Sequence, residues 1–320
     1  MNMIQPLWYG KPYYSLDAYC KNTYHEKLYK IALNAGLTCP NRDGTLDTRG
    51  CIFCSGEGSG DFSKRITAES DFSKIIEYSL SQIYNKKTGN RYIAYFQSFT
   101  NTYGPVKYLE RIYRLALEHP DVAGISIATR PDCLSEEILQ LLSALPKEYP
   151  DKFIWVELGL QSIHEKTAQF IRRGYSLSCF EQAVSDLTDI GIPAIVHIIL
   201  GLPGESVSQQ LETISYLNTL PIRGIKLQLL HLLKGTDLGI LYEQEPERYH
   251  SYESMEEYLA VLISCLEHLR PDIVIHRLTG DAPKDLLLSP EWSLHKRTVL
   301  NTLHHLMKQQ STYQGRLYVP

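Results

Sequence analysis

The chain has 320 residues, of which 43% are hydrophobic and 21% charged, as in a folded globular protein with a substantial core. Its 32 lysines and arginines against 36 aspartates and glutamates give a net charge of −4, which argues against a protein that coats nucleic acid through phosphate charge alone. Residues 1–14 contain no apolar run of a secretory signal, and the longest apolar run, 192–204, is shorter than the roughly 18 residues of a membrane span. The sequence therefore predicts a cytoplasmic protein that does not associate with membranes.

Apolar segments of strand length alternate with segments of helical periodicity. The predicted strands are residues 27–33, 91–98, 123–129, 153–160, 194–200 and 224–230. Helical segments lie between them, and a capping box of Ser178 and Glu181 predicts a helix over 178–191. This alternation is typical of parallel strands with helices outside. Six such units predict an α/β fold, an open (β/α)6 partial TIM barrel.

The pattern changes after residue 245. A long helix, a strand and a closing helix are predicted over 253–269, 273–278 and 293–309. We therefore expect a barrel domain with an N-terminal cap, 1–245, and a small α/β carboxyl-terminal extension that packs on it, 246–320.

Cysteines gather in the loop after the first predicted strand. Cys51 and Cys54 form a C-x-x-C pair, and Cys39 precedes them by twelve positions. In a reducing compartment such a group is more typical of a metal site than of a disulfide. A structural zinc site needs four ligands, and Cys20 or His25 could supply the fourth. Three thiolates without an evident fourth instead suit a [4Fe–4S] cluster with one open iron.

Several segments resemble known families. CIFC has the C-x-aromatic-C form that ends the cluster motif of radical S-adenosylmethionine (radical SAM) enzymes, although their common spacing is C-x3-C-x2-C and this chain has C-x11-C-x2-C. YFQSFTNTYGP, ATRPDCL, VELGLQSIHEKT, RRGYS and HIILGLPGE resemble YtqA/YhcC-type radical SAM proteins, and the resemblance covers nearly the whole chain. TRPD, ELGLQS, RRGYS and GIKLQLLHLLKGTDL also resemble the radical SAM part of the elongator catalytic subunit, a tRNA wobble-uridine enzyme.

The resemblance implies roles for the cysteine loop. Cys39, Cys51 and Cys54 would hold a [4Fe–4S] cluster, and the amino and carboxylate groups of S-adenosyl-L-methionine (SAM) would chelate its fourth iron. Phe53 would then lie near the adenine of SAM, with a place in the core as the alternative.

The resemblance also implies SAM contacts on later strands. Thr100 and Asn101 stand where many members carry a glycine-glycine-glutamate that receives the methionine amino group, with a simple turn as the alternative. Glu157 and Gln161 stand where members place polar contacts to SAM. A carboxylate in an apolar strand is costly without a partner, which favours function for Glu157. His197 is expected to be a satisfied core group.

Other candidates lie at the ends of further strands. Gly201 and Gly204 resemble a fifth-strand glycine motif that lets the backbone approach the adenine. Arg130 is expected to meet the carboxylate of SAM or of the substrate, with an ordinary ion pair at the rim as the alternative. Lys226 and Gln228 are expected on opposite or alternating faces of their strand, so that one lines the pocket.

The implied activity is reductive cleavage of SAM to methionine and a 5′-deoxyadenosyl radical, with an electron donor such as flavodoxin or ferredoxin. The implied substrate is tRNA, with conversion of 5-carboxymethylaminomethyl-2-thiouridine to 5-aminomethyl-2-thiouridine as the expected reaction and Arg130 and Glu157 as the expected catalytic residues. Two alternatives stay open: radical SAM chemistry on a small metabolite, and a zinc-stabilised RNA-binding module without catalysis.

Overall fold

The computed structural model describes residues 8–58, 63–83 and 91–320. Residues 1–7, part of the segment 1–14 in which no secretory signal is predicted, lie outside the described residues. Its centre is a sheet of eight parallel strands in the order β2-β1-β3-β4-β5-β6-β7-β9. In chain order these strands are β1 (Tyr29–Asn34), β2 (Lys64–Arg65), β3 (Tyr92–Phe96), β4 (Val122–Thr129), β5 (Phe153–Gln161), β6 (Ala194–Leu200), β7 (Gly224–Leu229) and β9 (Val274–Arg277). All seven strands expected from the apolar segments are present, which confirms the predicted partial barrel.

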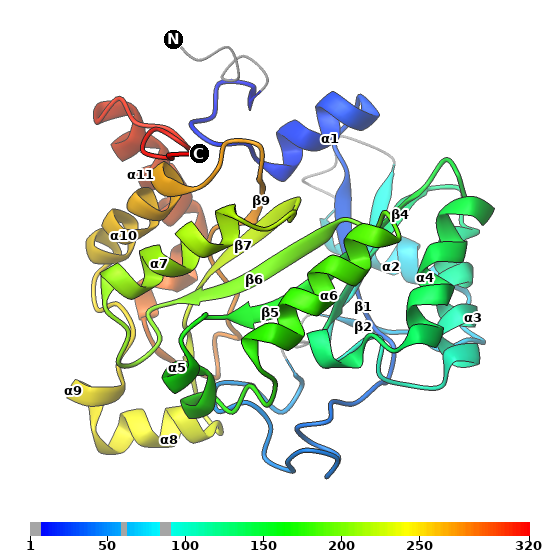
Figure 1. Cartoon of the computed structure of the whole chain (residues 1–320), viewed down its shortest axis with the longest axis horizontal. Helices are drawn as coiled ribbons and strands as arrows, with labels where there is room; N and C mark the ends of the chain where they lie inside the picture. Colours follow the sequence, from blue (N-terminus) through cyan, green and yellow to red (C-terminus); the bar gives the residue numbers. More distant parts are fainter. Residues whose placement is uncertain (1–7, 59–62, 84–90) are drawn as a thin grey trace.

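Helices cover the outer face of the curved sheet (Figure 1). They are α2 (Phe72–Ile83), α3 (Val106–Leu117), α4 (Glu136–Glu148), α6 (Leu177–Asp189) and α7 (Val207–Asn218), whereas the short helix α5 (Glu165–Phe170) lies below β5 in Figure 1. Nearly every residue of β4 and β6 is buried because helices pack on one face and the barrel interior lies on the other. Strands covered on both faces therefore appear in the sequence as continuous apolar runs.

The predicted N-cap of α6 was wrong by two residues, and the helix begins at Leu177. The N-cap is Ser176, whose Oγ accepts a hydrogen bond from the Cys179 backbone N–H at 3.2 Å. Ser178 lies inside the first turn, and its hydroxyl is 2.8 Å from that of Ser176. Two serines two positions apart compete for the cap, and the one whose Oγ reaches the N–H three residues on takes it.

The carboxyl-terminal segment contributes to the barrel sheet itself. After α8 (Asp237–Gln244) and α9 (Pro246–Tyr249), helix α10 (Met255–His268) leads into β9, which pairs in parallel with β7. A two-stranded antiparallel sheet of β8 (Leu232–Leu233) and β10 (Leu287–Ser289) and helix α11 (Lys296–Gln309) complete the chain. The division at residue 245 stays a prediction. None of the helices in the described ranges combines the length and hydrophobicity needed to cross a bilayer.

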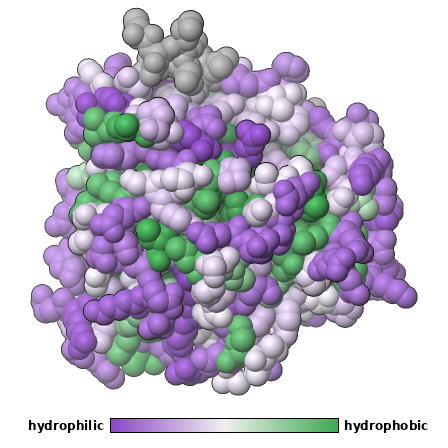
Figure 2. Space-filling model, viewed as in Figure 1, coloured by the Kyte–Doolittle hydropathy of each residue, from purple (hydrophilic) through white to green (hydrophobic). Residues whose placement is uncertain are grey.

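Helix α1 (Leu16–Tyr24) closes the amino-terminal end of the barrel. Ile93, Trp155 and Ile195 point inward near the beginnings of their strands, and Tyr19 of α1 packs edge-on against Trp155 with 5.9 Å between ring centroids. In Figure 1 α1 crosses the top of the molecule, and the loop that follows β1 lies below the sheet. Among the described residues, α1 therefore covers the amino-terminal end of the barrel interior. On the face shown in Figure 2 hydrophilic residues predominate, and the apolar areas are small and separate.

Candidate active site

A cavity of about 210 Å³ lies at the carboxyl ends of the strands. The cysteine loop forms one wall, and residues of β3 to β7 and β9 form the others. In βα barrels the catalytic residues lie at this end, because the last side chains of all the strands and the loops that follow them meet there.

The three cysteines of the loop, Cys39, Cys51 and Cys54, line this cavity together. The side chain of Asn41, which is buried, donates from Nδ2 to the Cys51 Sγ at 3.5 Å and to the Arg172 carbonyl oxygen at 2.7 Å. The hydrogen bond with Cys54 lowers the pKa of the Cys51 thiol to about 7. Three thiols at one wall, with an amide donor directed at one of them, fit a [4Fe–4S] cluster with three protein ligands.

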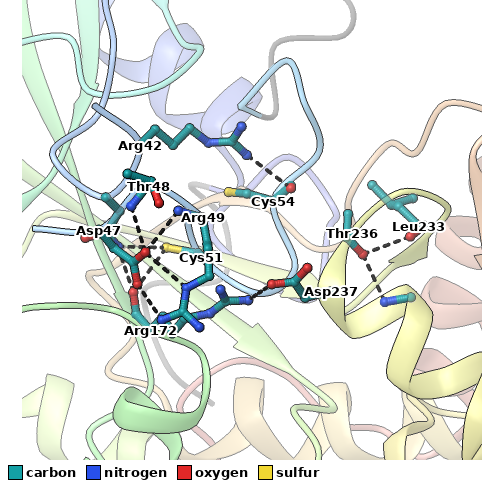
Figure 3. A network of polar contacts seen from close by, with 12 residues as sticks. Arg42, Asp47, Thr48, Arg49, Cys51, Cys54, Arg172, Leu233, Thr236 and Asp237 are labelled. Atoms are coloured by element: carbon teal, nitrogen blue, oxygen red, sulfur yellow. Dashed lines mark hydrogen bonds and ion pairs between the residues drawn. The ribbon is translucent and has the colours of Figure 1, made fainter. Parts of the chain in front are cut away.

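Backbone contacts fix the loop between two other segments. The Ile52 N–H donates to the Ile171 carbonyl oxygen at 3.2 Å, and the Leu238 N–H donates to the Ile52 carbonyl oxygen at 2.9 Å. Figure 3 shows Arg42 reaching back to the carbonyl of Cys54, which its Nη2 meets at 3.2 Å. Ile52, between Cys51 and Cys54, is therefore held through both its N–H and its carbonyl oxygen, and Arg42 holds the Cys54 end of the pair.

The predicted zinc alternative gains no fourth ligand from the structure. Cys20 lies within α1 and His25 caps it, at the closed end of the barrel away from the cysteine loop. Within residues 8–58, 63–83 and 91–320, no three His, Cys, Asp or Glu side chains lie close enough together to hold a single metal ion.

Below the thiols the barrel interior is layered, because every second residue of a strand points inward. The deepest layer is apolar and contains Ile93, Trp155 and Ile195. Two residues further along the same strands lie Tyr95, Glu157 and His197, and two further lie Gln97, Gly159 and Ile199, all of which line the cavity. At a rise of about 3.3 Å per residue, each layer stands roughly 7 Å above the one beneath it.

Glu157 is the centre of the middle layer and is fully buried. Its Oε1 accepts hydrogen bonds from Lys30 Nζ at 2.9 Å and Ser126 Oγ at 2.5 Å. Its Oε2 accepts from His197 Nε2 at 2.6 Å and forms an ion pair with Lys226 Nζ. Residues of five strands thus meet at one carboxylate, and both of its oxygens are engaged.

These contacts set the charges of the layer. Burial alone raises the pKa of Glu157, but Lys226, Lys30 and the His197 hydrogen bond outweigh it and hold the pKa well below its usual range. Burial, with the charge of Lys226, lowers the pKa of His197 to about 4, so this imidazole is neutral near pH 7. The expectation that His197 is a satisfied core group is confirmed, although it also lines the cavity.

Four other predicted residues lie on the cavity wall: Phe53, Thr100, Arg130 and Gln161. Phe53 also packs against a small apolar cluster, as the alternative predicted, and its place near the adenine of SAM stays a prediction. Arg130 donates to Asp132 from Nε at 2.9 Å and from Nη2 at 2.7 Å, which is the ion pair weighed as the alternative.

Gln161 ends β5 with a φ of 62°, in the left-handed region that costs a non-glycine residue about 1 kcal/mol or more. Its Oε1 accepts a hydrogen bond from Tyr175 OH at 3.3 Å. Such strain is concentrated at functional sites.

Three predicted cofactor contacts lie outside this cavity. Asn101 is fully buried behind the wall and its Nδ2 donates to the carbonyl oxygens of Ser98 and Ala128. Gly201 and Gly204 line a separate hollow, where a Cβ on Gly201 would come within 3.0 Å of Tyr252. Their roles toward SAM stay predictions.

The expectation for Lys226 and Gln228 was wrong. Both line the same cavity, because residues two apart in a strand share a face. Sequence reasoning missed Tyr95, Arg173 and Arg277 altogether. Strand periodicity alone would have placed Tyr95 on the interior face, two residues after Ile93.

The family model described as "Radical SAM superfamily" matches residues 48–217, and "Radical_SAM C-terminal domain" matches residues 222–309. The chain is 39% identical to the uncharacterized protein YtqA of Bacillus subtilis over 96% of this chain and 93% of YtqA. It is 27% identical to a tRNA uridine(34) acetyltransferase of Methanocaldococcus infernus over 52% of this chain and 30% of that protein. The expected likeness to YtqA/YhcC-type radical SAM proteins is confirmed.

Among solved structures, the Elp3 of Methanocaldococcus infernus with an N-terminal deletion superposes with a TM-score of 0.63. The match has 15% sequence identity and covers 90% of this chain and 65% of that one. At this identity the likeness concerns the fold alone.

Proposed function

This chain belongs to the radical SAM superfamily, and from that premise we propose that it converts 5-carboxymethylaminomethyl-2-thiouridine in tRNA to 5-aminomethyl-2-thiouridine. Membership of the superfamily brings a [4Fe–4S] cluster, SAM and the need for an electron donor, for which flavodoxin and ferredoxin are candidates. The cluster and SAM supply, when bound, a 5′-deoxyadenosyl radical that takes a hydrogen atom from the substrate. Cys39, Cys51 and Cys54 would hold the cluster.

The observation that supports this substrate is a cation-rich layer beneath the thiol wall, within one cavity. Lys226 and Arg277 line the cavity together with the cysteines. A substrate with a carboxylate beside the carbon that loses hydrogen suits such a cavity, because the carboxylate can be seated while its neighbouring carbon stays near the thiols. The likeness to an enzyme named for tRNA uridine 34 supports the choice of nucleoside.

The carboxymethylaminomethyl group has a suitable C–H bond. Its methylene lies between an amine and a carboxylate, and a carbon radical there is stabilised from both sides. In the overall balance, one SAM and one water are consumed for each uridine. The hydrogen atom ends on 5′-deoxyadenosine, the amine stays on the nucleoside, and the two carbons leave as glyoxylate. Cleavage of SAM uses one electron, and the substrate radical loses one electron when it is oxidised to the imine that water hydrolyses. The two electrons cancel, so no further oxidant is needed.

The residues of the barrel would orient the group and exclude water. The apolar layer of Ile93, Trp155 and Ile195, capped by α1, seals the closed end. A substrate therefore enters from the side of the cysteine loop, and bulk water is kept from a radical formed inside.

The test is mass spectrometry of tRNA nucleosides from cells with and without the gene. We expect 5-carboxymethylaminomethyl-2-thiouridine to accumulate in the deletion strain and the aminomethyl form to disappear. An unchanged nucleoside profile would contradict the proposal and favour a small anionic metabolite, which the cavity of about 210 Å³ could also enclose.

A further inference from the structure

The middle layer of the barrel holds more cationic side chains than carboxylates. Glu157 is shared by Lys30 and Lys226, so two ammonium groups face one carboxylate. Arg277, which pairs in register with Lys226 on the neighbouring strand, adds a third cation to the cavity wall.

No described carboxylate fully compensates Arg277. Its Nη2 lies 3.5 Å from Asp281, and Lys296 already bonds both oxygens of that carboxylate at 2.6 and 2.7 Å. Burial lowers the pKa of Lys226 well below its usual value, and the charges of Lys30 and Arg277 lower it further, against the influence of Glu157. The charged form of Lys226 is thus unfavourable in this desolvated place, and an anion bound beside it would stabilise the ammonium group.

Within the part of the chain that the structure describes, Lys226 has one N–H group left for such an anion. Of its three N–H groups, one is directed to Glu157 and one to Tyr95 OH at 2.8 Å. Its ammonium also lies over the Tyr95 ring, 4.2 Å from the centroid. The group is held from two sides while it lines the cavity, so its position does not depend on the ligand.

Arg130, the other cation that could bind the substrate carboxylate, already forms an ion pair with Asp132. Its Nε and Nη2 both bond Asp132, so a carboxylate of the protein already compensates its charge and only the Nη1–Nη2 edge remains for another acceptor. Lys226 also lies deeper in the barrel than the cysteine wall, where the methionine end of SAM would bind. It is therefore separated from that end of SAM. Lys226 is the third residue of β7, in the middle of its strand.

We propose that Lys226 and Arg277 seat the carboxylate of the substrate's carboxymethyl group, with Glu157 positioning Lys226. This rests on the proposed function, and it assigns to these two residues the substrate contact that the sequence suggested for Arg130. Gln228, one layer above Lys226 on the same face, lies beside the path to this seat.

The test compares two RNA probes in binding to the full chain with its cluster and SAM. One is an anticodon stem-loop that carries 5-carboxymethylaminomethyl-2-thiouridine, and the other carries the neutral primary amide of the same group. The ratio of the two dissociation constants at one salt concentration cancels the phosphate contribution. We expect the intact protein to prefer the carboxylate by roughly 10- to 100-fold, as for hydrogen bonds to a charged group.

Lys226→Met and Arg277→Gln should each reduce this preference at least several-fold. Arg277 is partly exposed, so its variant remains informative if Lys226→Met fails to fold. Arg111→Gln, on the solvent side of α3, is the matched control and should keep the full ratio. Equal affinity of the intact protein for both probes would contradict the proposed carboxylate site of Lys226 and Arg277. An unchanged ratio of the two dissociation constants in both variants would contradict it as well. If the intact protein prefers the carboxylate probe but fails to convert it under reducing conditions, the proposed function is refuted, whereas the carboxylate site of Lys226 and Arg277 is supported.

Discussion

Replacement of Glu157 by glutamine should destabilise the fold strongly, and the contacts made by Oε2 should be affected more than those made by Oε1. The glutamine Oε1 can still accept from Lys30 and Ser126, but its Nε2 would face Lys226 and His197, which are both donors toward that position. The change also leaves two lysines without their carboxylate. Breaking a buried ion pair from one side costs roughly 3–5 kcal/mol, and we expect Glu157→Gln to lie in that range.

Lys226→Met should cost less, because Glu157 keeps Lys30 and His197. We expect about 1.5 kcal/mol, the contribution of one charge-assisted hydrogen bond. The double variant should be more stable than Glu157→Gln alone by at least about 1 kcal/mol, since it removes the lysine that the glutamine leaves unpaired.

The assay is equilibrium urea unfolding of anaerobically reconstituted proteins with matched iron content, followed by circular dichroism. Comparable slopes with denaturant would show that the unfolding transitions can be compared. A loss below about 1 kcal/mol for Glu157→Gln, or strictly additive losses in the double variant, would refute the described coupling.

Three further predictions concern single residues. Asn41→Ala removes the amide donor to Cys51 and should make the reduction potential of the cluster more negative by about 20–60 mV. Potentiometry followed by electron paramagnetic resonance would measure this shift, and an unchanged potential would contradict the role of Asn41. Because the folded pKa of His197 is about 4, the unfolded chain binds its proton first as the pH falls below about 6.5, and stability is lost toward pH 4. His197→Gln should reduce the slope of unfolding free energy between pH 6 and 5 by about 1.4 kcal/mol per pH unit, and an identical slope would exclude a neutral buried His197. Cys54→Ala should abolish SAM cleavage, whereas Cys133→Ala, which faces a different hollow, should retain it; cleavage that survives the first change would argue against the assigned ligands.

The strands were predictable because parallel strands buried on both faces leave continuous apolar runs. The segments 123–129 and 194–200 differ from the observed β4 and β6 by at most one residue. Element ends depend on single hydrogen bonds, and the cap at Ser176 rather than Ser178 was decided by which hydroxyl reaches a backbone N–H.

The cysteine ligands were predictable from local spacing, whereas the charged layer was not. Lys30 and Glu157 are 127 residues apart, and no local pattern links them. Strand periodicity would have placed Lys226 and Gln228 on one face, but not the ion pair between Lys226 and Glu157 across the barrel. That pairing depends on strand order and on the narrow interior, which only the folded chain specifies.

The proposed reaction begins when a hydrogen atom is taken from the methylene between the amine and the carboxylate of the wobble-uridine side chain. The most direct measurement uses the reconstituted enzyme, SAM, a reductant and an anticodon stem-loop deuterated at that methylene. Mass spectrometry of the 5′-deoxyadenosine formed then reports the origin of its new hydrogen. We expect 5′-deoxyadenosine with one deuterium, formed together with the aminomethyl nucleoside. Nucleoside conversion without deuterium transfer, or unlabelled 5′-deoxyadenosine with no conversion, would contradict it.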